Sequence, residues 1–243
     1  MKISIIVPVL NEAESLRAFL ADLRKRAPKA EIIVVDGGSD DGTLALANDL
    51  AGELSLRALR SERGRAKQMN AGAASAAGDV FWFVHADTRI PRTAIADIES
   101  ALKDRHVVGG FFRMRFPRER FIYRFSDSIG HYVGVLVGIR YGDHAFFCQR
   151  KDFFATGGYP DVPLFEDAEF YRRLRRRGRT RHLRSEIITS PHRYEQLGPY
   201  RLTASYLLLS ALYLFRVPIP VLVRIYNRLC LSAGERPHLA NRE

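Results

Sequence analysis

A strand-like, apolar run at residues 79–89, DVFWFVHADTR, ends on His85 and Asp87. The Asp87 carboxylate can hold a hard divalent cation, Mg²⁺ or Mn²⁺, with substrate phosphates supplying further oxygen ligands. It can equally cap the helix expected to follow, because aspartate is favoured at helix N-termini. His85 can assist a metal, since imidazole suits Mn²⁺ or Zn²⁺ better than Mg²⁺, or can be an ordinary half-buried histidine. Asp87 can therefore be a metal ligand or a helix cap, and His85 can be a metal ligand or an ordinary histidine.

Two further places offer carboxylates. Asp36 ends the apolar run EIIVVD, ahead of the turn GGSDDGT. Turn chemistry explains the polar residues at 39–42 better than it explains Asp36, whose carboxylate can accept a hydrogen bond from a nucleobase N–H. Glu166 and Asp167 open a predicted helix, EDAEFYRRL. There they can complement the helix dipole or act as a general base toward a hydroxyl nucleophile.

An arginine-rich segment, YRRLRRRGRTRHLR, occupies residues 171–184. A solvated helix face explains such a run, and an anionic lipid surface would suit it equally well. Specific nucleic-acid binding is not expected, because no aromatic side chains are interleaved as in single-strand binders. His192 follows this segment. It can be a metal ligand, a hydrogen-bond donor to a phosphate group or a surface histidine. Phosphate-loop, dinucleotide-binding and serine-hydrolase motifs are absent from the sequence, which disfavours those enzyme classes.

Composition bounds the remaining possibilities. The length of 243 residues and the hydrophobic fraction of 47% suit one large domain, with or without an appendage. The formal net charge of +11 suits anionic partners. Cys148 and Cys230 stand in unrelated contexts and form no disulfide framework, so we expect a reducing, cytoplasmic compartment. The N-terminal apolar run meets Asn11 and Glu12 instead of a cleavage site, so no signal peptide is expected.

Apolar runs alternate with helical patterns through the first 90 residues. The predicted strands cover residues 3–8, 31–36, 54–60 and 79–85. This alternation predicts an α/β fold whose parallel sheet carries helices on both faces. Ligands bind such sheets at the carboxyl ends of the strands, so we expect Pro8, Asp36 and Asp87 to lie along that edge.

The second half of the chain is more mixed. The predicted helices cover residues 91–104, 119–136 and 168–178, and the predicted strands cover residues 107–116, 144–150 and 180–189. From Gly198 onward the chain is apolar and helical, and its run at 205–215 is too short to span a bilayer. This segment predicts either a packed helix pair or an interfacial helix that lies on a membrane.

Four segments together resemble the family 2 glycosyltransferases, which have the GT-A fold. They are IIVPVLNEAESL, IIVVDGGSDDGT, GRAKQMNAGAASAAGDVFWFVHADTRIP and GGYPDVPLFEDAEFYRRLRRRG, in the family's order over most of residues 2–190. The pattern is most similar to small bacterial transferases found beside radical-SAM and selenium-related domains. The resemblance implies a GT-A domain at 1–195, with a nucleotide-binding half at 1–90 and an acceptor-side half at 91–195, followed by a C-terminal helical appendage at 196–243.

The resemblance places the nucleotide against the first half of the chain. Pro8 and Glu12 would lie near the nucleobase and ribose, and Asp36 would bind the base. Arg65 and Lys67 would add positive charge near the phosphates. The family's usual second strand ends in Asp-Asp, whereas Asp36 is followed by glycine, which leaves the contact to the ribose less defined.

The resemblance also implies a metal site and a base. Asp87 would be the metal-binding aspartate of a DxD-type motif whose first aspartate is replaced here by His85. Metal binding would then rest on Asp87, with His192 completing the site. Asp167, beside Glu166, would deprotonate the acceptor hydroxyl, and a single displacement would invert the anomeric carbon.

The expected function is therefore an inverting, metal-dependent transfer of a sugar from a UDP- or GDP-linked donor to an acceptor hydroxyl. The apolar, basic C-terminal segment fits a lipid-linked acceptor and a peripheral position on the inner face of the membrane. A nucleotidyltransferase is disfavoured because VLNE, and no glycine-rich basic loop, follows the first strand. The rival is a noncatalytic protein that binds polyanions or a membrane surface through a transferase fold, and its polyanion binding would be strongly salt-dependent.

Overall fold

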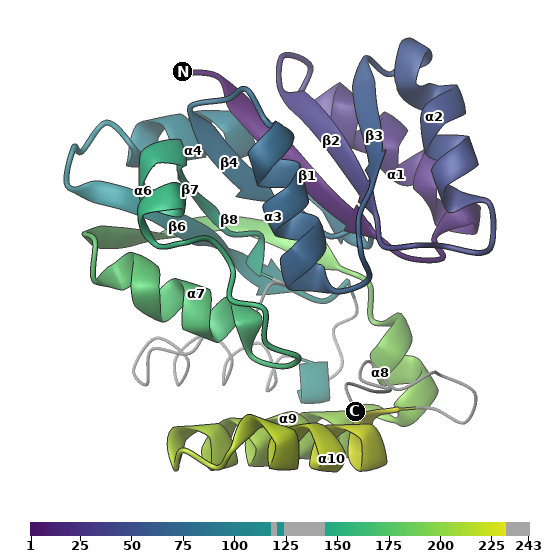
Figure 1. Ribbon diagram of the computed structural model, residues 1–243, viewed down its shortest axis with the longest axis vertical. Helices are drawn as coiled ribbons and strands as arrows, with labels where there is room; N and C mark the ends of the chain where they lie inside the picture. Colours follow the sequence, from purple (N-terminus) through teal and green to yellow (C-terminus); the bar gives the residue numbers. More distant parts are fainter. Residues whose placement is uncertain (118–120, 124–143, 232–243) are drawn as a thin grey trace.

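The computed structural model describes residues 1–117, 121–123 and 144–231, and its centre is one mixed sheet (Figure 1). The strands are β1 (Ile3–Val9), β2 (Glu31–Asp36), β3 (Leu56–Arg60), β4 (Val80–Phe83), β5 (Thr88–Arg89), β6 (Val107–Arg115), β7 (Phe147–Gln149) and β8 (Arg179–Thr189). Their order is β3-β2-β1-β4-β7-β6-β8-β5. Among the strands of the described residues, only the short strands β7 and β5 run against their neighbours. The predicted, mostly parallel α/β sheet is confirmed.

Helices cover both faces of this sheet. They are α1 (Ala13–Arg26), α2 (Thr43–Glu53), α3 (Arg65–Ser75), α4 (Ala94–Ala101), α6 (Arg150–Ala155), α7 (Glu166–Arg175), α8 (His192–Leu197), α9 (Pro199–Leu214) and α10 (Ile219–Cys230). Because successive strand residues point to opposite faces, Ile5 and Ile6 belong to different core clusters. The cluster of Ile5 includes residues of α1, α2 and α4, and the cluster of Ile6 includes residues of α3, α6 and α7. Helices α3 and α6 lie in front of the sheet in Figure 1.

The predicted elements differ from the observed ones in several places. The helix expected at 91–104 is shorter, since α4 begins at Ala94 and ends at Ala101. Helices α6 and α8 and the two-residue strand β5 were not predicted, because each is too short to show a hydrophobic period. Most of the helix expected at 119–136 lies outside the described residues. The division expected between 195 and 196 falls inside α8 and stays a prediction.

The arginine-rich segment is partly used in ion pairs at the surface. The pairs in the described part of the chain include Arg172–Glu169, Arg177–Asp152, Arg179–Asp104 and Arg181–Asp104. Asp152 is buried, whereas the other three pairs are partly exposed, and partly exposed pairs contribute little to stability individually. They fit the interpretation of this run as a solvated face, because acidic neighbours balance several of its charges.

Helices α9 and α10 form the packed pair that the sequence offered as one of two possibilities. Leu209 of α9 and Leu222 of α10 share an apolar cluster, and Phe165 and Ala168 at the start of α7 belong to the same cluster. The pair lies below the carboxyl edge of the sheet in Figure 1. Among the residues described, no helix combines the length and apolarity needed to cross a membrane.

Close contact between α3 and the sheet depends on Gly72. A Cβ atom at this position would come within 2.4 Å of Ile6 Cγ2 and 3.0 Å of Val35 Cγ2. We expect Gly72→Ala to lower the free energy of unfolding by about 2 kcal/mol, because overpacking a dense core forces strain. Urea denaturation measures the change. Gly52→Ala is the matched control: open space surrounds Gly52 in α2, so helix propensity should make that variant more stable by about 0.5–1 kcal/mol. Equal stabilities would contradict the prediction.

Candidate active site

The carboxyl ends of β2, β1 and β4 are neighbours in the sheet, which brings the first group of candidate residues to one edge. Pro8 pairs with Val35, and Val9 pairs with Asp36. His85 and Asp87 follow β4, whose Phe83 pairs with Ile6 of β1. Pro8 is buried within the sheet, and its place near a nucleotide stays a prediction. The expected row of groups at the carboxyl edge is therefore present.

Asp36 is used by the turn that follows it. Its carboxylate accepts hydrogen bonds from the Gly38 N–H at 2.9 Å and the Ser39 N–H at 3.1 Å, and the Ser39 hydroxyl donates to it as well. The residue is 1% exposed. Turn chemistry therefore accounts for Asp36 better than the sequence indicated, because the carboxylate completes the turn. Base binding by Asp36 stays a prediction, and it would use whatever acceptor capacity this turn leaves.

The loops after β1 and β2 are tied together by polar contacts. Asn11 adopts a left-handed backbone with φ of 56°, and its side-chain oxygen accepts a hydrogen bond from the Asp40 N–H at 3.1 Å. The Glu12 N–H donates to Thr43 Oγ1 at 2.8 Å, and the Glu12 carboxylate accepts from the Ser15 hydroxyl at 2.8 Å. Both loops therefore form one rigid rim beside the expected nucleotide.

Helix α3 brings positive charge to the same edge. Gln68 was missed by the sequence reasoning, yet its buried amide donates to Val9 O at 2.8 Å and to Val35 O at 2.9 Å. These bonds anchor the first turn of α3 to the ends of β1 and β2. The helix begins at Arg65, and Lys67 pairs with Glu62. A helix N-terminus with two cations attracts phosphate groups.

The predicted nucleotide side and the predicted catalytic pair meet in one ion pair. Arg65 Nε lies 2.8 Å from Glu166 Oε1, and the side-chain exposures are 44% and 4%. Arg65 opens α3 and Glu166 opens α7. The N-termini of two helices that are far apart in sequence therefore face the same place, with a partly exposed guanidinium between them.

Asp167 is buried beside this ion pair at the start of α7. Phe165, just before the acidic pair, has a left-handed backbone with φ of 67°, which is uncommon for a bulky residue and is a feature of functional sites. Burial, together with the Asp167 charge, raises the pKa of Tyr159 well above its ordinary value. The Tyr159 phenol therefore stays neutral beside the carboxylates. Asp167 and Glu166 do occupy the first turn of α7, so the dipole interpretation also holds.

A pair of hydrogen bonds holds Tyr159 in place. Asn70 of α3 donates its amide to Tyr159 O at 2.8 Å and accepts from the Tyr159 N–H at 2.9 Å. The Tyr159 ring stacks on Phe170 of α7 at 4.3 Å between centroids. Asn70 was not among the predicted residues, although it lies in the quoted segment GRAKQMNAGA. Its contacts couple α3 to the segment that leads into the acidic pair.

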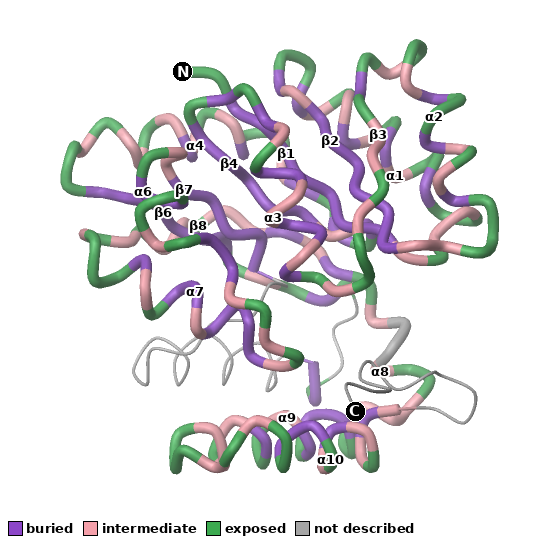
Figure 2. Tube along the Cα trace, in the orientation of Figure 1, coloured by how far each residue is buried: buried purple, intermediate pink, exposed green. Residues whose placement is uncertain are grey.

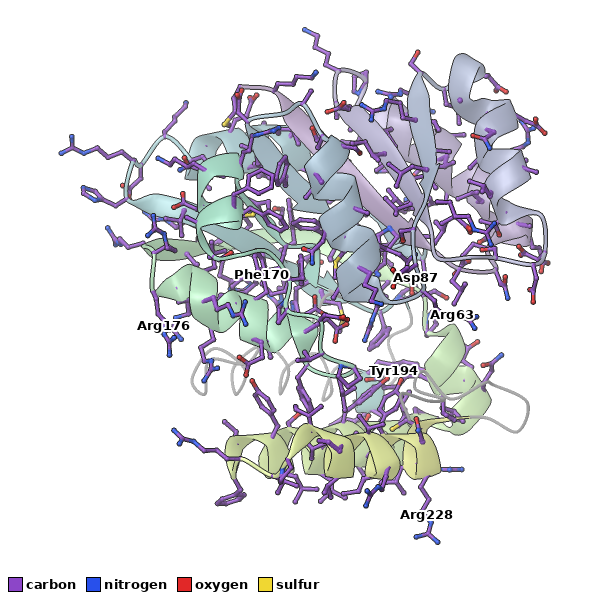
Figure 3. All side chains as sticks on the ribbon, in the orientation of Figure 1. Arg63, Asp87, Phe170, Arg176, Tyr194 and Arg228 are labelled. Carbon is purple, nitrogen blue, oxygen red and sulfur yellow. The ribbon has the colours of Figure 1, made fainter. Side chains whose placement is uncertain are left out.

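Asp87 is exposed and does not cap a helix. Helix α4 begins at Ala94, and Thr93 precedes it, so the capping interpretation of Asp87 is wrong. Its carboxylate accepts from the Thr88 hydroxyl at 3.2 Å, and its backbone oxygen accepts from the Ser190 N–H at 3.1 Å, which ties the segment to the end of β8. Figure 3 shows Asp87 at the carboxyl edge, with Tyr194 between this edge and the helix pair.

Asp87 forms no complete metal site with the other described residues, so metal binding at Asp87 stays a prediction. His85 is half-buried two residues before Asp87, and the described residues contain no cluster of three His, Cys, Asp or Glu that could hold an ion. A single exposed carboxylate suits a hard cation whose other ligands are phosphate and water. His192 begins α8, but its side chain lies outside the described residues, so its metal role stays a prediction.

A shallow hollow of about 310 Å³ also borders Asp87. Its other lining residues come from α1 and from residues 86–90. None of them belongs to α3 or α7, so the Arg65–Glu166 ion pair does not line this hollow. The candidate site therefore consists of the ion pair and the buried acidic side chains.

We expect Arg65→Ala to lower the free energy of unfolding by about 1–2 kcal/mol, because the buried Glu166 loses its charged partner. We expect the lower part of the range for an unpaired buried group, because the Arg65 side chain is 44% exposed and water screens the ion pair. Thermal and urea unfolding measure the effect. Arg63→Ala, at an exposed position in the preceding loop, is the control and should change little. In Arg65→Ala/Glu166→Gln most of the loss should be recovered, and a double variant as unstable as the single one would contradict the pairing.

Part of this chain is similar in sequence to curated glycosyltransferases. Dolichol-phosphate mannosyltransferase of Pyrococcus furiosus is 32% identical over 122 residues, which cover 45% of this chain and 35% of that protein. The chain spans about a third of the length of the first curated relatives it matches.

Solved structures show the same fold. A mannosyltransferase of Pyrobaculum calidifontis, in complex with GDP-Man and Mn²⁺, superposes with a TM-score of 0.68 at 22% identity, over 94% of this chain and 70% of that one. Glucosyl-3-phosphoglycerate synthase of Mycobacterium tuberculosis, with Mn²⁺ and UDP-glucose, gives a TM-score of 0.59 at 14% identity, over 89% and 80% of the two chains. The predicted GT-A fold is confirmed. The model of glycosyl transferase family 2 matches residues 4–161, more than half of the sequence, and the chain therefore belongs to that family.

Proposed function

We propose that this chain transfers a sugar from a nucleoside-diphosphate donor to an acceptor hydroxyl with inversion at the anomeric carbon. The observation that carries the proposal is the Arg65–Glu166 ion pair, which joins a cationic helix start to a buried acidic pair. A donor diphosphate at the first turn of α3 would set its sugar toward the first turn of α7. The neighbouring structures contain GDP-Man and UDP-glucose, which supports a GDP- or UDP-linked donor.

The residues of the chain divide the work as follows. Arg65, Lys67 and the α3 N–H groups bind the phosphates, and the rim around Glu12 and Asp36 holds the nucleoside. Asp167 accepts the proton of the acceptor hydroxyl as its oxygen attacks the anomeric carbon. The bond from that carbon to the diphosphate oxygen breaks on the opposite face, and the nucleoside diphosphate leaves. One displacement of this kind inverts the configuration.

Asp87, with His85 or His192 as candidate helpers, would hold a divalent ion, Mn²⁺ or Mg²⁺. When bound, such an ion neutralises charge that develops on the leaving diphosphate. Mn²⁺ accompanies the nucleotide sugar in the neighbouring structures, which supports the choice of metal. The exposed position of Asp87 leaves room for phosphate ligands.

The acceptor and the cellular location belong to the proposal as well. Two relatives are named for lipid-phosphate substrates, dolichol-phosphate mannosyltransferase and polyprenol monophosphomannose synthase. We therefore propose a lipid-linked acceptor and a cytoplasmic protein that works at the inner face of the membrane. The excess positive charge of the chain fits such an anionic surface.

The test is release of nucleoside diphosphate from a panel of UDP-, GDP- and dTDP-sugars, with Mn²⁺, Mg²⁺ or a chelator. Slow release from one donor that requires metal is expected, because water replaces the missing acceptor. The anomeric configuration of the product, read by NMR, tests inversion. No release from the panel, together with no thermal shift by any nucleotide and metal, would overturn the proposal in favour of the noncatalytic binding protein.

A further inference from the structure

One side of α9 is apolar and faces solvent. Tyr200, Leu207, Leu208, Leu214 and Phe215 are 70%, 39%, 46%, 46% and 84% exposed. Leu207 and Leu214 follow Tyr200 at intervals of seven residues, and Phe215 follows Leu208 by seven. Seven residues make nearly two turns at 3.6 residues per turn, so these side chains lie in one stripe along the helix. The exposed alanines at 204 and 211 fill the same stripe. Figure 2 shows exposed segments along the helix pair, below the rest of the molecule.

The opposite side of α9 is occupied by protein contacts. Leu202 and Leu209 are buried with α10 and the start of α7. The Tyr213 ring stacks on Phe165 at 4.3 Å between centroids, and its hydroxyl donates to Glu169. Helix α9 is therefore apolar on both sides, although only one side has a protein partner in the described structure. A surface helix of a globular protein normally keeps its outer side polar.

The charges around the stripe have a single sign. Residues 199–230 contain four arginines and no aspartate or glutamate. The arginines are Arg201, Arg216, Arg224 and Arg228, and all four are exposed. Arg228 points away from the sheet in Figure 3. Elsewhere on the molecule arginines pair with acidic neighbours, so the lack of acids here favours an anionic partner.

We propose that α9 and α10 dock on the surface of an anionic phospholipid bilayer. The docking face consists of Tyr200, Leu207, Leu208, Leu214, Phe215 and Val221 with Arg201, Arg216, Arg224 and Arg228. Its apolar side chains enter the boundary between headgroups and acyl chains, and its arginines meet the lipid phosphates. A second copy of the chain fits this face less well, because a two-fold contact would set arginines against arginines.

Docking in this way would leave the acidic pair buried behind α9, on the side of the helix that packs against the start of α7. Phe165 precedes Glu166 directly, and Tyr213 of α9 holds its ring. A lipid-linked acceptor in the bilayer would therefore have to pass the helix pair to reach Asp167; this consequence alone rests on the proposed function. Lipid binding itself is measured without any transfer of sugar.

The experiment is cosedimentation of the full chain with vesicles of phosphatidylcholine, alone or mixed with phosphatidylglycerol, at low and high salt. We expect binding to the mixed vesicles that weakens with salt. Arg224→Gln/Arg228→Gln should lower the affinity by about fivefold per arginine, roughly 25-fold for the pair. Leu208→Ser/Phe215→Ser should lower the affinity for mixed vesicles by about tenfold or more at either salt concentration.

Matched controls change the same residue types away from the docking face. Phe154→Ser on α6, and Lys29→Gln/Arg92→Gln in exposed loops, should bind like the wild type. Thermal unfolding checks that every variant is folded, and the arginine variants test the face even where the serine variants do not fold.

Wild-type binding by the docking-face variants, or no binding to mixed vesicles, would overturn the proposal. A dimer in light scattering that Leu208→Ser/Phe215→Ser dissociates would assign the face to a second copy instead. Vesicle binding without release of nucleotide would keep the docking face and remove the transferase proposal.

Discussion

Asp167→Asn is expected to lower the rate of glycosyl transfer by roughly 100- to 10,000-fold, the usual contribution of a general base. The amide keeps the size of the side chain and cannot take the acceptor proton. Asp167 is buried at the start of α7 beside Arg65 and Glu166, where substrate would exclude water. Initial rates with a donor from the panel and its acceptor measure the loss, and thermal shift by the donor nucleotide should be unchanged.

The control for this variant is Asp161→Asn, which makes the same chemical change at an exposed position in the segment before α7. It should retain the wild-type rate. A rate for Asp167→Asn within a few-fold of the wild type would remove Asp167 as the base. Loss of nucleotide binding along with the rate would show instead that the change disrupts the site, since the base acts on the acceptor and not on the nucleotide.

Asp87→Ala is expected to reduce the affinity for Mn²⁺ in the presence of nucleoside diphosphate by about 100-fold or more. Loss of a group that only supports a ligand already costs 10- to 100-fold in metal affinity, and Asp87 is proposed as the ligand itself. The exposed carboxylate follows β4 at the edge where the strands end. Calorimetric titration of Mn²⁺ into protein with UDP or GDP measures the affinity, and the metal dependence of donor hydrolysis should fall in parallel.

Asp49→Ala removes an exposed carboxylate from α2 and is the matched control. Its Mn²⁺ affinity and hydrolysis rate should equal those of the wild type. If Asp87→Ala binds Mn²⁺ as the wild type does, the ion is held elsewhere, and His85 and His192 are then tested by the same titration. If neither protein shows metal binding, hydrolysis in a chelator decides whether the reaction uses a metal.

Much of the first half of the fold follows from local patterns. The runs ISIIVP and EIIVVD are apolar on both faces, and a strand of that kind is stable only inside a sheet covered on both sides. The observed β2 has the predicted limits, Glu31–Asp36, and β1 extends one residue past its prediction. Glycine and aspartate in GGSDDGT predict a turn because their backbone and side-chain preferences are local.

The second half could be predicted less completely. Strand β7 lies between β4 and β6 and runs against both, a placement that depends on long-range pairing. The sequence of α9 is apolar all round, so its period cannot say which side is buried. The stacking of Tyr213 on Phe165 shows which side of α9 faces the protein. The capping interpretation of Asp87 failed because β5 and a turn separate Asp87 from α4, which begins at Ala94.

The sequence by itself determined the family pattern, the parallel strands of the first half and the residue types available for chemistry. Only the tertiary structure decided which of those residues meet. Gln68 reaches the ends of two strands, and Arg65 reaches Glu166 across the site. The physical reason is that periodicity and turn preference act between neighbours in the chain. Contacts between distant residues form only when the whole core closes and sets each helix start at its final position.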